Sequence, residues 1–370
     1  MLRLPGLIDP HVHLREPGGE HKEDWDSGTA SAIAGGFTVV LAMPNTQPPI
    51  TDRETLDLAL AAAKRKARCD YAQYLGAGAE NVGAASQMAS DVAGLKIYLD
   101  QTYGPLRLSA AAGGVAPSAQ DVLSLLKSHF QHWPTASPIV AHAEGLSLAG
   151  VILMAALTGQ PVHLAHVSRA GEILLIRRAK EQGIKVSCEV TPHHLFLTED
   201  DVQRLGPGRS EVRPTLATAA DRDALWANLE IIDCFATDHA PHTAQEKDGS
   251  NPPPGFPGLE TALPLLLTAV HDGRLTVDDL VLRMWENPRR IFGIPAQDDT
   301  WVEVDESATY EIHSRDARTR CGWTPFEGFK GRGRVTRVVL RGQTVYRDGR
   351  VLAAPGSGRN IRLRESNPNG

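Results

Sequence analysis

Two histidines near the start of the chain have a type and spacing that could do chemistry. His11 and His13 lie in the apolar segment 7–13, which predicts a β-strand. Because strand side chains alternate between faces, the two imidazoles project to the same side. Two imidazoles on one rigid element can present two nitrogen ligands to one divalent metal. An isolated His-x-His is equally compatible with two ordinary histidines, so the other ionisable residues decide the interpretation.

Four further ionisable residues lie in or directly after apolar segments that also predict strands: Lys96, His142, His166 and Asp238. Taken singly, a histidine after an apolar strand is more often a hydrogen-bonded core residue than a metal ligand. All six candidates, however, fall at the carboxyl ends of the expected strands. That joint placement is what a metal site requires and what packing alone does not.

Lys96 is the most informative of the six, because its neighbours in the expected strand 94–98 are almost all apolar. An ammonium buried there would suffer a desolvation cost of several kcal/mol unless it were paired. Burial therefore favours the neutral amine. A neutral amine can add carbon dioxide to become a carbamate, an anion whose two oxygens can bridge two metals. The alternative is a salt bridge to Asp238 or to another acid at the strand ends.

The elements that must position these residues follow an alternating pattern of short apolar segments and longer helical stretches. The expected strands are residues 7–13, 37–43, 70–75, 94–98, 139–143, 162–165, 185–190 and 231–237. The clearest helical patterns are residues 55–68, 121–130, 148–157 and 170–182. This pattern predicts an α/β fold of the (β/α)8 TIM-barrel class, whose functional residues gather where the strands end.

An open doubly wound sheet is the main alternative fold. It would normally carry a Gly-rich phosphate turn after its first strand, whereas this chain has HLREPG there. The sequence therefore favours the barrel. Residues 109–120 predict an exposed connection of low complexity. Residues 252–258 contain four prolines, which lack a backbone donor, and so predict a stiff loop over the barrel mouth.

The expected domain organisation is a barrel over residues 7–298 and a small β appendage formed by residues 1–6 and 299–353. The strand patterns of the appendage are residues 301–304, 334–340 and 343–346. Residues 354–370 are polar with Gly and Pro, and predict a linker or tail.

Composition limits the class of function. The chain has 370 residues, of which 42% are hydrophobic and 22% charged, as in a soluble globular protein. A formal charge of -6 offers no basic surface for nucleic acid or an anionic membrane. No apolar run reaches about 18 residues and no secretory leader is visible. The four cysteines form no C-x-x-C pair and fit reduced thiols, so we expect a cytoplasmic location.

An ordered set of motifs resembles the dihydroorotases of the amidohydrolase superfamily. The motifs are HVHLREPG at 11–18, MPNT at 43–46, GLK at 94–96, HAE at 142–144 and DHAPH at 238–242. The chain looks most similar to the dihydroorotase domain of the animal-type multifunctional pyrimidine-biosynthesis protein. The resemblance spans roughly residues 3–351. A short His-x-His motif is weak evidence, whereas this ordered set is strong.

The resemblance implies a binuclear zinc centre with two Zn²⁺ per chain. The implied ligands of the two ions are His11, His13 and Asp238 for one, and His142 and His166 for the other. Carboxylated Lys96 would bridge both, and a hydroxide would sit between the metals because zinc lowers the pKa of its water to about 7. Dihydroorotases interconvert N-carbamoyl-L-aspartate and dihydroorotate in the biosynthesis of UMP. Asp238 would carry the proton, as acid in one direction and as base in the other.

The substrate carries carboxylates, which predicts cationic binding residues. Arg15, just past His13, is placed to bind a carboxylate with two hydrogen bonds. The resemblance adds Asn45, His242 and Arg213 as substrate-binding residues. For Asn45 the alternative is ordinary turn chemistry, and for Arg213 it is a surface salt bridge.

The segment after the lysine strand corresponds to a mobile loop of this family that closes over the substrate. Thr102 would give a hydrogen bond and Tyr103 would exclude water. Animal domains usually have Phe where this chain has Tyr103, and Cys where it has Ala165. The missing thiolate weakens the case for an additional metal, although Glu189 is kept as a candidate for such a metal or for holding a metal ligand from behind.

Alternative functions of different classes remain open at this point. Allantoinases and hydantoinases share the two-metal barrel, but their substrates need not carry the carboxylate that Arg15 and Asn45 would hold. A second alternative is a catalytically inactive dihydroorotase-like structural domain, although this chain keeps every ligand. Mononuclear deaminases lack the bridging lysine. By resemblance, the partners are neighbouring carbamoyl phosphate synthetase and aspartate transcarbamoylase domains of the same polypeptide, and a second copy in a homodimer.

Overall fold

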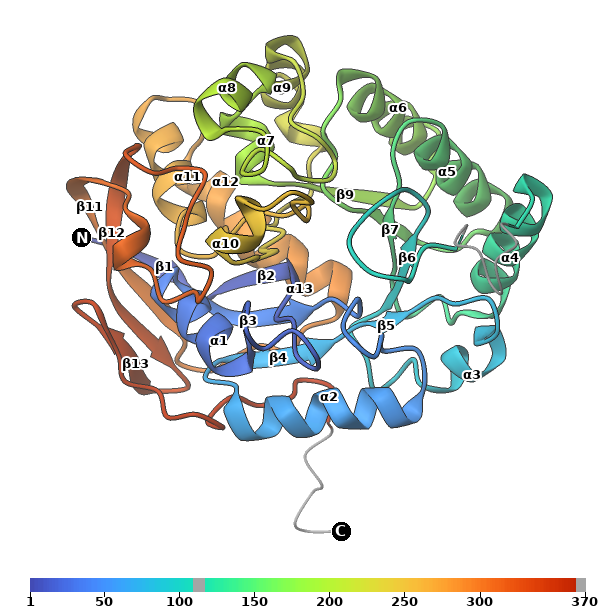
Figure 1. Ribbon diagram of the computed structural model, residues 1–370, viewed down its shortest axis with the longest axis horizontal. Coiled ribbons are helices and arrows are strands. Elements are labelled where there is room, and N and C mark those ends of the chain that lie inside the picture. The colour runs from blue at the N-terminus through green and yellow to red at the C-terminus, as the bar shows by residue number, and fades with distance from the viewer. Residues whose placement is uncertain (109–116, 364–370) are drawn as a thin grey trace.

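The computed structural model describes residues 1–108 and 117–363, and its centre is a barrel of parallel strands (Figure 1). The barrel strands are β2 (Leu7–Val12), β3 (Phe37–Ala42), β4 (Asp70–Gln73), β5 (Leu75–Gly76), β6 (Leu95–Tyr98), β7 (Ile139–His142), β8 (Val162–Leu164), β9 (Val186–Val190) and β10 (Cys234–Phe235). β4 and β5 are two halves of one strand, broken at Tyr74. The pairs run in sequence order from β2 to β4 and from β5 to β10. All of them are parallel.

The barrel closes where β10 meets β2. Val12 and His239 form a parallel bridge, and the His13 N–H donates to the His239 carbonyl at 2.7 Å. The Asp9 carboxylate reinforces this seam, because it accepts from the Thr237 hydroxyl at 2.6 Å and from the Thr237 backbone N–H at 3.2 Å. The (β/α)8 prediction is therefore confirmed. The eighth strand is much shorter than expected, because residues 236–237 pair with the side chain of Asp9 and with β9 rather than with a full strand.

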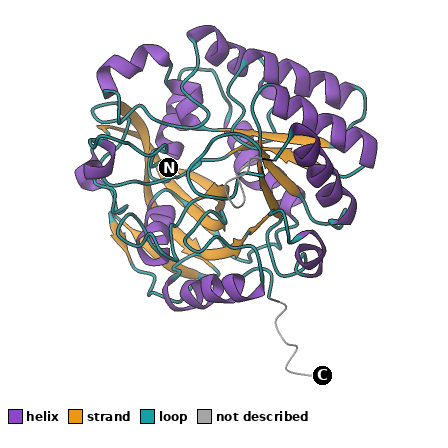
Figure 2. Ribbon diagram, turned by 45° about the vertical axis from the view of Figure 1, so that its right-hand side comes forward, coloured by secondary structure: helices purple, strands orange, loops and turns teal. Residues whose placement is uncertain are grey.

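Helices surround the strands (Figure 2). They are α1 (Trp25–Ala34), α2 (Arg53–Lys66), α3 (Val82–Gln87), α4 (Ala119–His132), α5 (Leu146–Thr158), α6 (Ala170–Glu181), α7 (Pro192–Phe196), α8 (Val202–Leu205), α9 (Ala219–Trp226), α10 (Ala244–Lys247), α11 (Ala262–His271), α12 (Val277–Val281) and α13 (Asn287–Phe292). Asp52 and Ser118 cap α2 and α4 with reciprocal hydrogen bonds, which explains where these helices begin. The four helices expected from the sequence are present. Within the described residues, no helix is long and apolar enough to span a bilayer.

A second, antiparallel sheet lies against the barrel. It comprises β1 (Leu2–Pro5), β11 (Trp301–Glu311), β12 (Lys330–Leu340), β13 (Gln343–Arg347) and β14 (Arg350–Val351), in the order β1-β11-β12-β13-β14. The strands expected for the appendage are present, and the chain start pairs with β11 as expected. Val302 packs near Leu7 and Leu263, which joins this sheet to the barrel.

The segment expected as a linker behaves differently over residues 354–363. The Tyr71 N–H donates to the Arg359 carbonyl, and the Ile361 N–H donates to the Tyr71 carbonyl, both at 2.9 Å. Asn360 is buried. This part of the expected linker is thus an ordered strap along β4, whose backbone groups on that side have no neighbouring strand to pair with. Of the expected connection 109–120, residues 109–116 lie outside the described residues, and α4 already begins at Ala119.

Candidate metal centre and active site

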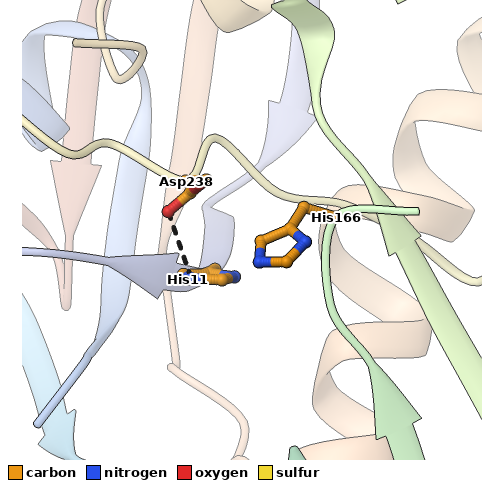
Figure 3. Close-up of side chains that lie close together, drawn as sticks. All are labelled: His11, His166 and Asp238. Carbon is orange, nitrogen blue, oxygen red and sulfur yellow. Dashed lines mark ion pairs between the residues drawn. The ribbon is translucent and has the colours of Figure 1, made fainter. Parts of the chain in front are cut away.

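The residues expected to bind metal converge on one cavity at the carboxyl ends of the strands. The lining residues among them are His11, His13, His142, His166 and Asp238. Figure 3 shows His11, His166 and Asp238 facing one another although they come from different ends of the chain. One possible ligand atom from each of these three residues lies within 4.8 Å of the others. The structure thus brings together residues that are more than two hundred positions apart in the sequence.

The two histidines at the end of β2, His11 and His13, are held in place from behind. His11 Nδ1 contacts a carboxylate oxygen of Glu189, and His13 Nδ1 lies 2.7 Å from Asn45 Oδ1. These acceptors fix the Nδ1–H tautomer and leave both Nε2 atoms free to face the cavity. The Nε2 atoms of His11 and His13 lie 3.1 and 3.0 Å from the same oxygen, Asp238 Oδ1. This half of the site is organised by protein groups alone.

Burial and charge set the protonation states that a metal needs. Burial lowers the pKa of His13 to about 4, so its imidazole is neutral at physiological pH. Burial works against ionisation of Asp238, but the His11 and His13 imidazoles that face it hold the pKa of this carboxyl well below its usual range. A neutral imidazole beside an ionised carboxylate is the donor set that binds Zn²⁺.

The histidines of the second half have fewer partners. The rings of His142 and His166 pack edge to face with their centroids 4.5 Å apart. His142 Nε2 and His166 Nδ1 are buried without a hydrogen-bond partner in the described structure. Burial lowers the pKa of both imidazoles, so both are neutral. Buried polar nitrogens without partners are costly, which fits atoms that are completed by a metal.

Lys96 is fully buried in β6, and no hydrogen bond or ion pair satisfies its Nζ among the described residues. The alternative interpretation was a salt bridge from Lys96 to Asp238 or to another acid at the strand ends. No such salt bridge is present among the described residues. Burial lowers the pKa of the amine to about 8. A buried amine that is partly neutral near physiological pH fits carboxylation better than it fits a buried, unpaired cation.

Three of the candidate residues have left-handed backbone conformations, which side chains other than glycine rarely adopt. The φ angles are +60° at Arg15, +36° at His166 and +45° at Asp238. Such conformations cost about 1–3 kcal/mol each and persist only where the surrounding structure enforces them. Their concentration at this cavity is typical of a functional site.

Arg15 presents a guanidinium to the cavity. Its Nε donates to the Pro241 carbonyl at 3.0 Å, Nη2 lies 3.0 Å from His242 Nε2, and Nη1 is buried without a partner. A buried cation with an open donor fits an anionic ligand group. His242 lies behind Arg15 and does not line the cavity. Its Nδ1 accepts from Lys22 Nζ at 3.0 Å, and its Nε2 also lies 3.0 Å from the Pro254 carbonyl oxygen.

The segment expected to be a mobile loop closes the cavity from outside. Thr102 and Tyr103 line both the inner cavity and an outer cavity, so they form the partition between them. Asn45 Nδ2 donates to the Tyr103 carbonyl at 3.0 Å, and Lys22 Nζ donates to the Tyr103 hydroxyl at 3.2 Å. Both ends of the Asn45 amide are therefore engaged by protein groups here, and its substrate contact stays a prediction.

Arg213 faces the cavity, as a substrate-binding residue would, and it also forms a salt bridge, which was the alternative. It lines both cavities, and its Nη1 pairs with a carboxylate oxygen of Glu211 at 2.9 Å. Glu189 is fully buried and engages both of its oxygens, one with His11 Nδ1 and the other with His163 Nε2 at 3.0 Å. Ala165 is buried and offers no ligand atom. Glu189 is therefore placed to hold His11 from behind.

The sequence did not reveal two buried lysines that support the site. Lys22 binds Glu246 at 2.8 Å in addition to Tyr103 and His242. Lys247 donates to the carbonyls of Glu211, Pro253 and Gly255 at 2.7 to 3.3 Å and so fixes the proline-rich loop over the cavity. The only available signal was indirect, because a loop of prolines lacks donors and needs them from elsewhere.

Comparison with known proteins agrees with this geometry. A family model described as dihydro-orotase-like matches residues 1–102. The multifunctional protein CAD of Squalus acanthias is 53% identical over 98% of this chain, and the chain spans 16% of the length of that protein. The dihydroorotase of Pyrococcus furiosus is 36% identical over 95% of this chain and 83% of its own length. The chain belongs to the dihydroorotase family.

Solved structures that are similar to this dihydroorotase-family chain include a hydantoinase and an inactive dihydroorotase-like domain. L-hydantoinase from Arthrobacter aurescens matches with a TM-score of 0.88 at 26% identity, over 97% of this chain and 88% of that chain. The inactive dihydroorotase-like domain of the Chaetomium thermophilum CAD-like protein matches with a TM-score of 0.81 at 30% identity, over 97% and 99% of the two chains. Family membership alone therefore does not establish activity, and the donor set of the site must carry that argument.

Proposed function

We propose that this chain is a zinc-dependent dihydroorotase, which reversibly cyclises N-carbamoyl-L-aspartate to dihydroorotate and water in pyrimidine biosynthesis. The observation that carries the proposal is a set of four imidazoles and a carboxylate around one cavity, with the buried amine of Lys96 unpartnered among the described residues and the open guanidinium of Arg15 beside the imidazoles. The 36% and 53% identity to a dihydroorotase and to CAD supports this substrate over the cyclic amides of the hydantoinases.

The proposed centre holds two Zn²⁺ ions. His11, His13 and Asp238 would bind one, His142 and His166 the other, with carboxylated Lys96 between them. The unpartnered His142 Nε2, His166 Nδ1 and Lys96 Nζ support this assignment. Zinc in such a site supplies Lewis acidity to the reacting carbonyl and to water.

The side chains of the protein supply the remaining steps. In the hydrolytic direction Asp238 accepts a proton from the attacking water and delivers it to the ring nitrogen as the amide bond breaks. In the cyclising direction Asp238 takes the proton from the ureido nitrogen and delivers it to the carboxyl oxygen that leaves as water. Arg15 binds the carboxylate that both substrate and product carry, together with Asn45 and Arg213, and His242 supports the Arg15 guanidinium from behind. Thr102 and Tyr103 close the cavity and exclude bulk water.

A side-by-side assay tests the proposed reaction. We expect the zinc-loaded protein to turn over dihydroorotate and N-carbamoyl-L-aspartate but not hydantoin or allantoin, because neither ring presents a carboxylate to Arg15. Turnover of hydantoin or allantoin alone would assign the chain to another cyclic amidohydrolase. No turnover of any of these compounds by a protein with full zinc content would place it with the inactive domains.

We also propose that the chain forms a homodimer through α5 and α6. Helix α5 contains no charged residue, and Leu146, Leu153 and Leu157 on α5 are exposed, beside exposed Leu174 on the adjacent α6. A surface helix normally has a polar outer face, so this apolar face fits coverage by a second copy. L153E combined with L157E should convert a dimer to a monomer in sedimentation, whereas L58E on α2 should not. A monomeric wild-type chain would refute the dimer.

Linked domains are the remaining partner proposal. The match over 98% of this chain to 16% of CAD supports a position within a longer multifunctional protein that also carries carbamoyl phosphate synthetase and aspartate transcarbamoylase. An antibody to this chain should detect a natural polypeptide far larger than 39.9 kDa in a source-cell extract. A natural polypeptide close to 39.9 kDa would contradict this proposal.

A further inference from the structure

One buried carboxylate outside the metal-binding set connects two loops of the site. Glu172 lies in the first turn of α6 and is 6% exposed. One of its oxygens accepts from the Gly145 backbone N–H at 2.9 Å. The other accepts from the Ser168 and Arg169 backbone N–H groups at 3.2 and 3.1 Å. All three donors are backbone groups, so the contact depends on where the loops run and not on their side chains.

The donors belong to the loops that carry the second pair of histidines. Gly145 follows His142 at the end of β7, and Ser168 follows His166 after β8. Glu172 therefore ties the loop of His142 to the loop of His166 through a single side chain. The imidazoles themselves are held less firmly from behind, because His166 Nδ1 has no partner among the described residues and His142 Nε2 faces only a Glu144 carboxylate oxygen at 3.5 Å.

The loop that carries His166 needs such a restraint. The backbone φ is +53° at Gly145 and +36° at His166, and the latter is unfavourable for a residue with a side chain. A loop that relaxed at either position would move the imidazole that it carries. The spacing of the His142 and His166 rings, 4.5 Å between centroids, thus depends on contacts that keep the two loops together.

We infer that Glu172 is a positioning residue that sets the spacing of His142 and His166 and thereby the affinity of the second zinc position. The inference rests on the two-zinc centre proposed above. Glu172 touches neither metal nor substrate. It acts only through the backbone of the two loops.

The chemistry of the side chain indicates which substitutions separate this role from simple stability. In E172Q the amide keeps the size of the side chain but has only one acceptor oxygen. Its NH₂ group must therefore face a backbone N–H of one loop, and two donors cannot form a hydrogen bond. In E172D the carboxylate is shorter by one methylene. We expect it to keep the N–H groups at the start of its own helix, Ser168 and Arg169, and to lose the reach to Gly145.

Zinc titration of the metal-stripped full chain against a competing chelator tests the inference. We expect two zinc ions per wild-type chain. In E172Q and E172D, the affinity of one position should fall by about 10- to 100-fold, the usual cost of losing a group that supports metal ligands. H142N identifies the affected position, because it should abolish the same binding step. The His11 and His13 position should keep its affinity in both Glu172 variants.

D279N is the matched control for a general loss of stability. Asp279 caps α12 through the Thr276 N–H at 2.9 Å and its hydroxyl at 2.7 Å, and it contacts no candidate ligand. D279N should lower the melting temperature and leave both zinc affinities unchanged. If wild type binds two zinc ions and both Glu172 variants bind them equally well, the inference alone is wrong. If wild type binds only one, the two-zinc proposal fails and the inference falls with it. If E172Q does not fold, E172D decides.

Discussion

The two halves of the proposed metal centre are built differently. At the end of β2, His11 and His13 each have an acceptor behind the ring, Glu189 and Asn45, and both face Asp238. At the ends of β7 and β8, His142 Nε2 and His166 Nδ1 have no hydrogen-bond partner among the described residues. The comparison teaches that protein groups organise the first half, whereas the second half has open nitrogens that the proposed metal would complete.

Lys96 belongs to both halves, and its removal should have the largest effect. K96A removes the group proposed to bridge the metals and should lose most bound zinc and all measurable turnover. Metal content by elemental analysis and the dihydroorotate assay together check this. Wild-type zinc content and activity in K96A would eliminate the bridging role.

Asp238 belongs to the organised half and should separate chemistry from folding. D238N keeps the shape of the side chain but not the base, so we expect activity to fall by about 100- to 10,000-fold, the usual contribution of a positioned proton carrier. Circular dichroism and the melting temperature should report a folded protein. Undiminished turnover would exclude Asp238 as the proton carrier.

Asn45 offers a way to make the first half resemble the second. N45L removes the acceptor behind His13 at similar size, and should weaken zinc at the first position by about 10- to 100-fold. Zinc titration measures this independently of substrate binding. If the affinity of the first position does not change, the acceptor does not contribute to its organisation.

Acid should destabilise the metal-stripped protein through the buried imidazoles. The pKa of His13 falls from 6.5 to about 4 because of burial, so between these values the unfolded chain takes up a proton that the folded chain does not. The free energy of unfolding therefore decreases as pH falls through this window, by up to about 1.4 kcal/mol per pH unit for one such histidine. Denaturant titrations from pH 7 to 4 on wild type and H13N measure it. If the free energy of unfolding has the same slope against pH in wild type and in H13N, the prediction is contradicted.

The smallest expected effect concerns the loop that covers both halves. Y103F removes only the hydroxyl that accepts from Lys22 at 3.2 Å. One hydrogen bond of this kind contributes about 0.5–1.5 kcal/mol, so KM should rise by roughly two- to tenfold with little change in kcat. Steady-state kinetics of Y103F and of K22M, which removes the donor of the same hydrogen bond, measures the effect. A KM that stays at the wild-type value in Y103F would show that this contact does not hold the loop.

Local patterns predicted most of the frame and that ionisable side chains gather where the strands end. Strand alternation placed His11 and His13 on one face, and the position of Lys96 inside an apolar strand indicated that it would be buried. What the sequence could not predict are contacts between distant segments. Lys22 beside His242 and Lys247 beneath the proline-rich loop are polar residues whose partners depend on the closed barrel. The strap 354–363 was missed for the same reason, because its polar composition says nothing about the open side of β4.

The most direct test of the central claim is an X-ray structure of the zinc-loaded protein with anomalous data at the zinc edge. We expect two anomalous peaks, one beside His11, His13 and Asp238 and the other beside His142 and His166, with continuous density for a carbamate on Lys96 between them. A single peak with an unmodified Lys96 would contradict the two-zinc account.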